Sequence, residues 1–112
     1  MAVYVDDVRH RFGRMIMCHM WADSMPELMD MATAIGVQHR WLQKPPAASW
    51  VHFDISLKKK AMAIERGAIL TDMFGPMEFL AKRDGNREAL ARIAHSRALR
   101  AKPPPPQGDL PL

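Results

Sequence analysis

Histidine and aspartate recur within and beside the apolar segments of this chain. His52 and Asp54 are two positions apart in the segment 50–55, so in an extended strand both side chains lie on one face. The carboxylate can orient the imidazole for proton transfer, or the two groups can bind a divalent metal ion together. A hydrogen bond at a strand end, with no chemical role, explains the same spacing.

A further histidine, His19, lies among methionines in the apolar segment 14–21. An imidazole titrates near neutral pH, and burial shifts its pKa readily, so His19 is a candidate metal ligand or general acid–base. The alternative is a core histidine that is satisfied by its neighbours. Cys18 is adjacent, but neighbouring residues of a strand face opposite sides, which argues against a Cys–His pair.

Carboxylates follow the first two apolar segments. Asp6 and Asp7 come directly after residues 3–5, and Asp23 follows residues 14–21. Groups at the carboxyl end of a strand often face the ligand in α/β proteins. Asp6 and Asp23 are therefore candidate ligands for Mg²⁺ or Mn²⁺, although the Asp6-Asp7 pair could equally cap the turn that follows.

Two groups of cationic residues could bind an anion. Arg40, Trp41 and Gln43 offer a guanidinium, an indole and an amide that could hold a nucleotide by stacking and hydrogen bonding; the alternative places Trp41 in the core. Lys58 begins a run of three lysines in the first turn of a predicted helix, where the helix dipole disfavours positive charge. A bound phosphate or carboxylate would offset that cost, and so would Asp54.

Local patterns define the elements that must position these residues. Runs of apolar, β-branched and aromatic residues predict strands near residues 3–5, 14–21, 38–42, 51–55 and 68–71. Ser24 and Glu27 form a capping box, and Gly36 is suited to end the helix that follows. Further helices are predicted after Ser56, from Gly75, and over residues 87–100, whereas residues 9–13 are expected to be a loop.

The alternation of these elements predicts an α/β fold. We expect a single small domain over residues 1–100, with a central mixed sheet of about four to five strands flanked by three to four helices. The length of 112 residues supports one core. Residues 101–112 contain four consecutive prolines and predict a flexible, proline-rich tail.

Composition excludes several classes of protein. No apolar run approaches the roughly 20 residues needed to span a bilayer, and the N-terminus lacks the pattern of a secretory signal. One cysteine can form neither an internal disulfide nor a CxxC zinc site. We therefore expect a cytoplasmic protein without a membrane partner. Residues 57–112 have a net charge of +5 against −1 for residues 1–56, which permits a polyanionic partner or a merely solvated helix face.

As a set, five sequence blocks resemble a family of short phage and bacterial proteins known only as a domain of unknown function. The blocks lie at residues 3–7, 17–23, 35–41, 52–56 and 67–72, and the resemblance covers about residues 2–80. Phe53 stands where the family leads us to expect tyrosine. The resemblance implies no activity, but it implies a setting among phages, prophages and their hosts.

The candidate residues together predict chemistry on a phosphate-containing substrate. We expect one pocket formed by Asp6, His19, Asp23, Arg40, His52, Asp54 and Lys58. In hydrolysis or group transfer on a nucleotide or nucleic acid, a histidine would act as general base or metal ligand. The carboxylates would orient it or hold Mg²⁺ or Mn²⁺, and Arg40 and Lys58 would stabilise negative charge. The alternatives are a non-enzymatic protein that binds a host protein, of the anti-defence type, and a nucleic-acid-binding module.

Overall fold

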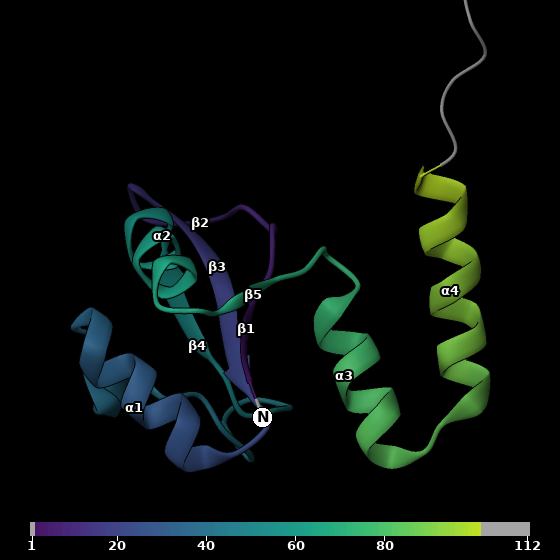
Figure 1. The fold of residues 1–112 in the computed structure, drawn as a ribbon, viewed down its shortest axis with the longest axis horizontal. Helices are drawn as coiled ribbons and strands as arrows, with labels where there is room; N and C mark the ends of the chain where they lie inside the picture. The colour runs from purple at the N-terminus through teal and green to yellow at the C-terminus, as the bar shows by residue number, and fades with distance from the viewer. Residues whose placement is uncertain (1, 102–112) are drawn as a thin grey trace, which may run out of the picture. The chain divides into compact units, whose positions relative to one another are not determined.

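The computed structural model describes residues 2–101 (Figure 1). The chain divides into two compact units, one ending at Gly75 and one beginning at Pro76. The single domain predicted over residues 1–100 stays a prediction. Of the predicted tail, residues 102–112 lie outside the described residues.

The first unit contains a mixed sheet of five strands, which confirms the predicted fold class. Its strands are β1 (Val3–Val5), β2 (His10–Phe12), β3 (Met15–Ala22), β4 (Phe53–Ser56) and β5 (Ile69–Leu70). Met20 of the long central strand β3 pairs with Val5 on one side and with Phe53 on the other. β2 pairs with the first part of one edge of β3, and β1 pairs with the last part of the same edge. β4 pairs with the other edge of β3. β5 extends the sheet by pairing in parallel with β1.

The alternation of side chains along β3 gives the sheet two different faces. Cys18 and Met20 point to one face and are buried, whereas Met17, His19 and Trp21 point to the other. The first face forms the hydrophobic core. The core residues are Val3, Val5, Cys18, Met20, Leu28, Ala32, Ile35, Phe53, Ile55, Ala63 and Ala68.

Two helices, α1 (Met25–Ile35) and α2 (Leu57–Glu65), cover the core face of this sheet (Figure 1). The Ser24 hydroxyl accepts a hydrogen bond from the Glu27 amide and donates one to its carboxylate. At the other end, Gly36 adopts a φ of 79°, which a residue with a Cβ disfavours. The capping box and the glycine stop therefore set the bounds of α1 as the sequence predicts.

One of the three lysines in the first turn of α2 binds the C-terminal end of α1. The Lys59 ammonium donates a hydrogen bond to the carbonyl of Ile35 at 2.6 Å. Positive charge is favourable at the C-terminal end of a helix, where carbonyls lack partners. The sequence pattern suggested an anion or Asp54 as partner for these lysines, but Lys59 is held by the neighbouring helix.

The second unit contains α4 (Arg87–Ala101) and, from Pro76 onward, α3 (Gly75–Asp84). The Asn86 side chain accepts a hydrogen bond from the Ala89 amide and caps α4. An ion pair between Arg97 and Glu78, at 2.7 Å, joins the two helices. Both helices were predicted from the sequence. Among the described residues, no helix has both the length and the apolar character needed to cross a membrane.

Two predictions about local structure are wrong. Residues 38–42 are not a strand but contain η1 (His39–Trp41), a 3₁₀ turn, and only Gln43 forms a bridge, with His52. The reason is that the imidazole of His39 contacts groups of α1, the Thr33 hydroxyl at 2.8 Å and the Met29 carbonyl at 3.1 Å.

Residues 9–13 are also not a loop throughout, because they include β2. Gly13, with a φ of 61°, allows a tight turn that folds β2 back along the start of β3. β2 has only three residues, two of them exposed, so it lacks the apolar alternation by which strands are recognised. β2 bears on function because it carries His10.

Candidate functional site

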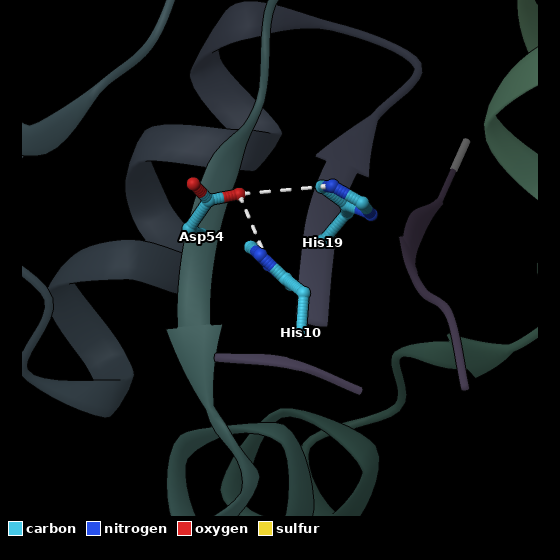
Figure 2. Close-up of side chains that lie close together, drawn as sticks. All are labelled: His10, His19 and Asp54. Atoms are coloured by element: carbon cyan, nitrogen blue, oxygen red, sulfur yellow. Dashed lines mark ion pairs between the residues drawn. The ribbon is translucent and has the colours of Figure 1, made fainter. Parts of the chain in front are cut away.

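The sheet face opposite the core gathers imidazole and carboxylate groups from three adjacent strands. His10 comes from β2, His19 from β3 and Asp54 from β4, and Figure 2 shows their side chains pointing toward one another. His19 pairs directly with Asp54, and His10 pairs with Met17, two residues before His19 on the same face. The rings of His10 and His19 stack with their centroids 5.2 Å apart. The register of β3 with its neighbours therefore builds the cluster.

One oxygen, Oδ1 of Asp54, lies at the centre of this group. It is 3.8 Å from Nε2 of His19, 3.9 Å from Nε2 of His10 and 3.5 Å from Nε2 of His52. Within the described residues, this oxygen and the His10 nitrogen are shielded from solvent and have no hydrogen-bond partner. Buried polar atoms normally have partners, so three nitrogens facing one unbonded oxygen form an unusual arrangement.

Asp6 fixes the orientation of His19 from behind. Its side chain is fully buried, in the segment between β1 and β2, and Oδ2 lies 2.7 Å from Nδ1 of His19. Oδ1 accepts hydrogen bonds from the backbone amides of His19, at 3.0 Å, and Val8, at 3.4 Å. The carboxylate bound to Nδ1 raises the pKa of His19, although burial opposes the increase. Nε2 of His19 is thereby left to face Asp54.

The second carboxylate oxygen of Asp54 accepts a hydrogen bond from the Gln43 amide at 2.5 Å. Burial favours the neutral form of Asp54, but interactions with His52 and Gln43, together with the charge of His19, outweigh it and lower its pKa. Asp54 is therefore an anion at neutral pH. Gln43 holds it so that Oδ1 remains directed at the histidines.

His52 is held by an aromatic group of side chains. Its ring stacks on Trp50 with centroids 4.2 Å apart, and Trp50 also contacts the rings of Trp21 and His19. Nδ1 of His52 lies 3.1 Å from the Trp50 carbonyl. A carbonyl can only accept, so Nδ1 donates the proton and Nε2 is the nitrogen that faces Asp54.

A groove of about 360 Å³ is lined in part by Asp54. Its lining residues are Phe12, Met15, Met17, Trp41, Gln43 and Asp54. Trp41 is 59% exposed and Phe12 is 73% exposed, so the alternative that places Trp41 in the core is wrong. The guanidinium of Arg40 lies 5.1 Å from the centre of the Trp41 ring. Of the predicted Arg40–Trp41–Gln43 set, Trp41 and Gln43 therefore line the groove, and Arg40 contacts the Trp41 ring.

Two other predicted pocket residues lie elsewhere. Asp23 is at the far end of β1 from Asp6, where its oxygens accept hydrogen bonds from the Ala2 amide and the Tyr4 hydroxyl. Lys58 is exposed on α2, which packs against the core face. The structure thus brings together His19, His52 and Asp54, with Asp6 behind His19, but not Asp23 or Lys58.

Two further positions support the interpretation of the two sheet faces. Cys18 is buried on the core face, and burial raises the pKa of its thiol to about 11, so it takes no part in the cluster. Phe53 is also fully buried in the core, so a hydroxyl at this position is not part of the site. The residue that the sequence reasoning missed is His10. The only local signal was Gly13, which is suited to a tight turn and follows His10 by three residues.

The fold and the cluster define a small α/β protein with a histidine–carboxylate site on the face of a mixed sheet opposite the core. The model of a family described as "Protein of unknown function (DUF4031)" matches residues 3–83, and the chain belongs to this family. The match confirms the resemblance to a family of unknown function and includes every residue of the cluster. Neither the curated proteins nor the solved structures gave a significant match.

Proposed function

We propose that this protein is a hydrolase or group-transfer enzyme that acts on a phosphate-containing substrate, best matched by a single nucleotide. The observation on which this proposal rests is the position of Asp54. It faces the histidines through one oxygen and also lines the groove. A substrate bound in the groove would therefore present its reacting bond to the cluster.

The groove suits a ligand with a flat apolar part and an anionic part. Trp41 and Phe12 expose aromatic rings on which a base can stack. Arg40, next to Trp41, offers a guanidinium that binds phosphate oxygens in pairs. A volume of about 360 Å³ lies within the range of small-molecule sites, which favours a nucleotide over a nucleic-acid duplex.

The cluster supplies groups that can activate the attacking water or alcohol. Oxygen of that nucleophile would bond to phosphorus, the bond from phosphorus to the leaving oxygen would break, and the departing oxygen would take up a proton. His52 and His19 each present Nε2 toward Asp54, which lines the groove. One imidazole can accept the nucleophile's proton while the other holds a metal ion. Asp6 fixes the orientation of the His19 ring for either role.

The test is phosphate release from a panel of nucleotides by the purified protein, with Asp54→Asn as the variant and Asp30→Asn as the matched control. Asp30 is an exposed acid on α1, on the other side of the sheet. We expect Asp54→Asn to lower turnover about 100-fold or more with an unchanged thermal midpoint, and Asp30→Asn to behave as wild type. Trp41→Ala should raise KM more than it lowers kcat.

Two results would contradict the proposal. The first is full activity in Asp54→Asn, which would remove the cluster from the chemistry. The second is no turnover of any nucleotide by the wild type, together with stoichiometric retention of a protein from host lysate by His52→Ala. That outcome would favour the non-enzymatic binding function instead.

A further inference from the structure

We infer that His10, His19 and Asp54 bind one divalent transition-metal ion. This inference deepens the proposed function, since it names what activates the nucleophile. It rests on the same site, but ion binding is measurable without any substrate. The three ligand atoms come from three neighbouring strands, and all of them lie within 4.8 Å of one another (Figure 2).

The spacing of the ligand atoms fits an ion between them. Ligands about 2.0–2.2 Å from an ion are separated from each other by roughly 3.0–3.6 Å in common geometries. Oδ1 of Asp54 lies 3.8 Å and 3.9 Å from the two Nε2 atoms. These two distances need to contract by only several tenths of an ångström, and the histidine nitrogens, which lie within 4.8 Å of each other, by about 1 Å at most. Side-chain torsions can supply movements of this size.

The atoms of the cluster that lack hydrogen bonds also indicate a bound cation. Oδ1 of Asp54 and Nε2 of His10 are shielded from solvent and lack hydrogen-bond partners within the described part of the chain. On folding, such atoms lose their hydrogen bonds to water and gain none in the protein, which costs free energy. A cation between them would satisfy both atoms and compensate the charge of Asp54.

Asp6 prepares His19 as a ligand. Metal-binding histidines commonly hydrogen-bond a carboxylate or carbonyl through the other ring nitrogen, which fixes the tautomer and strengthens the ligand. Asp6 holds Nδ1 of His19 at 2.7 Å and is itself fixed by backbone amides. The buried carboxylate thus directs the lone pair of Nε2 toward the site.

The types of ligand select the class of ion. Two imidazole nitrogens and one carboxylate oxygen suit Zn²⁺, Fe²⁺, Co²⁺ or Mn²⁺, whereas Mg²⁺ prefers oxygen ligands. Three protein ligands also leave coordination positions for water, the arrangement of catalytic rather than structural sites. Nε2 of His52, 3.5 Å from Asp54, is placed to accept a hydrogen bond from water on the ion. An ion lowers the pKa of such water and makes it a nucleophile near neutral pH.

The test is titration of chelator-treated full-length protein with Co²⁺, followed by visible absorption, and with Zn²⁺, followed by calorimetry. We expect one ion per chain with micromolar or tighter affinity, and no displacement by millimolar Mg²⁺. His10→Ala and Asp54→Asn should weaken binding at least 10-fold. Asp6→Asn should weaken it about 10–100-fold as a positioning residue, and His95→Ala, an exposed histidine on α4, should have no effect.

The outcomes separate the metal site from the proposed reaction. Stoichiometric Co²⁺ binding without turnover of any nucleotide supports the site and overturns the reaction. Turnover that survives complete chelation, in a protein that binds neither ion, overturns the site and leaves the reaction standing. Equal affinity of wild type, His10→Ala and Asp54→Asn would also overturn the site, because binding would then occur elsewhere.

Discussion

The substitution Asp6→Asn tests how this protein positions His19. Asp6 is fully buried and accepts hydrogen bonds from the His19 and Val8 backbone amides and from the His19 ring. Asparagine keeps the shape and can still accept from the backbone amides. It loses the negative charge and presents an amide NH₂ toward Nδ1, which forces the opposite tautomer of His19.

The cost of this change follows from the bond that is lost. A hydrogen bond to a charged group contributes about 1.5–3 kcal/mol, and removal of a buried carboxylate recovers part of its desolvation cost. We therefore expect Asp6→Asn to lower the free energy of unfolding by about 2 kcal/mol. For a chain of this length, that corresponds to a fall of roughly 8 °C in Tm.

The pH dependence of this difference gives a second, sharper prediction. Because Asp6 raises the pKa of His19 in the folded protein, the stabilisation from the imidazolium charge is fully present below the ordinary histidine pKa of about 6.5. It is lost as the pH rises through the raised pKa. The stability difference between wild type and Asp6→Asn should therefore be largest near pH 6 and decrease toward pH 9.

The assay is urea unfolding of metal-free wild type and Asp6→Asn at pH 6, 7, 8 and 9, with Asp30→Asn as the control. Equal unfolding midpoints of wild type and Asp6→Asn at pH 6 would refute the role assigned to Asp6. A difference that increases with pH would refute the assigned direction of the His19 pKa shift.

Three further predictions concern parts of the fold outside the cluster. Cys18, buried with a pKa of about 11, should resist iodoacetamide at pH 8 until urea unfolds the protein; prompt labelling of the native state would contradict its placement in the core. Lys59→Ala should lower stability by about 1 kcal/mol, because it removes the charged donor at the end of α1, whereas Lys58→Ala should not, and equal thermal midpoints for the two variants would exclude this contact. Gly75→Ala should lower the free energy of unfolding by about 1–3 kcal/mol, because the added Cβ would lie 2.4 Å from the Thr71 methyl group. Adding Thr71→Ala to this variant should recover much of the loss in denaturant unfolding. No recovery in the double variant would exclude this clash.

The elements predicted correctly are those with strong local signals. The bounds of α1 follow from Ser24 and Gly36, which act on backbone groups only a few residues away. The common face of His52 and Asp54 follows from the alternation with buried Phe53 and Ile55. Such features depend on neighbouring residues, so the sequence alone is sufficient to predict them.

The parts that were missed depend on pairing between distant residues. β2 exists because Gly13 turns the chain back along β3, and this pairing, not an apolar pattern, places His10 beside His19. Asp6 lies under His19 because its segment passes the middle of β3. From sequence alone Asp6 could equally have held a metal ion or capped a turn. The structure shows the carboxylate orienting the histidine.

The most direct test of the metal site is a crystal structure of the Co²⁺-treated protein with anomalous diffraction measured at the cobalt edge. We predict one strong anomalous peak about 2.0–2.2 Å from Nε2 of His10, Nε2 of His19 and Oδ1 of Asp54, with the Asp6–His19 hydrogen bond intact. A map with no peak between these three atoms, or with its strongest peak at other side chains, would contradict the account.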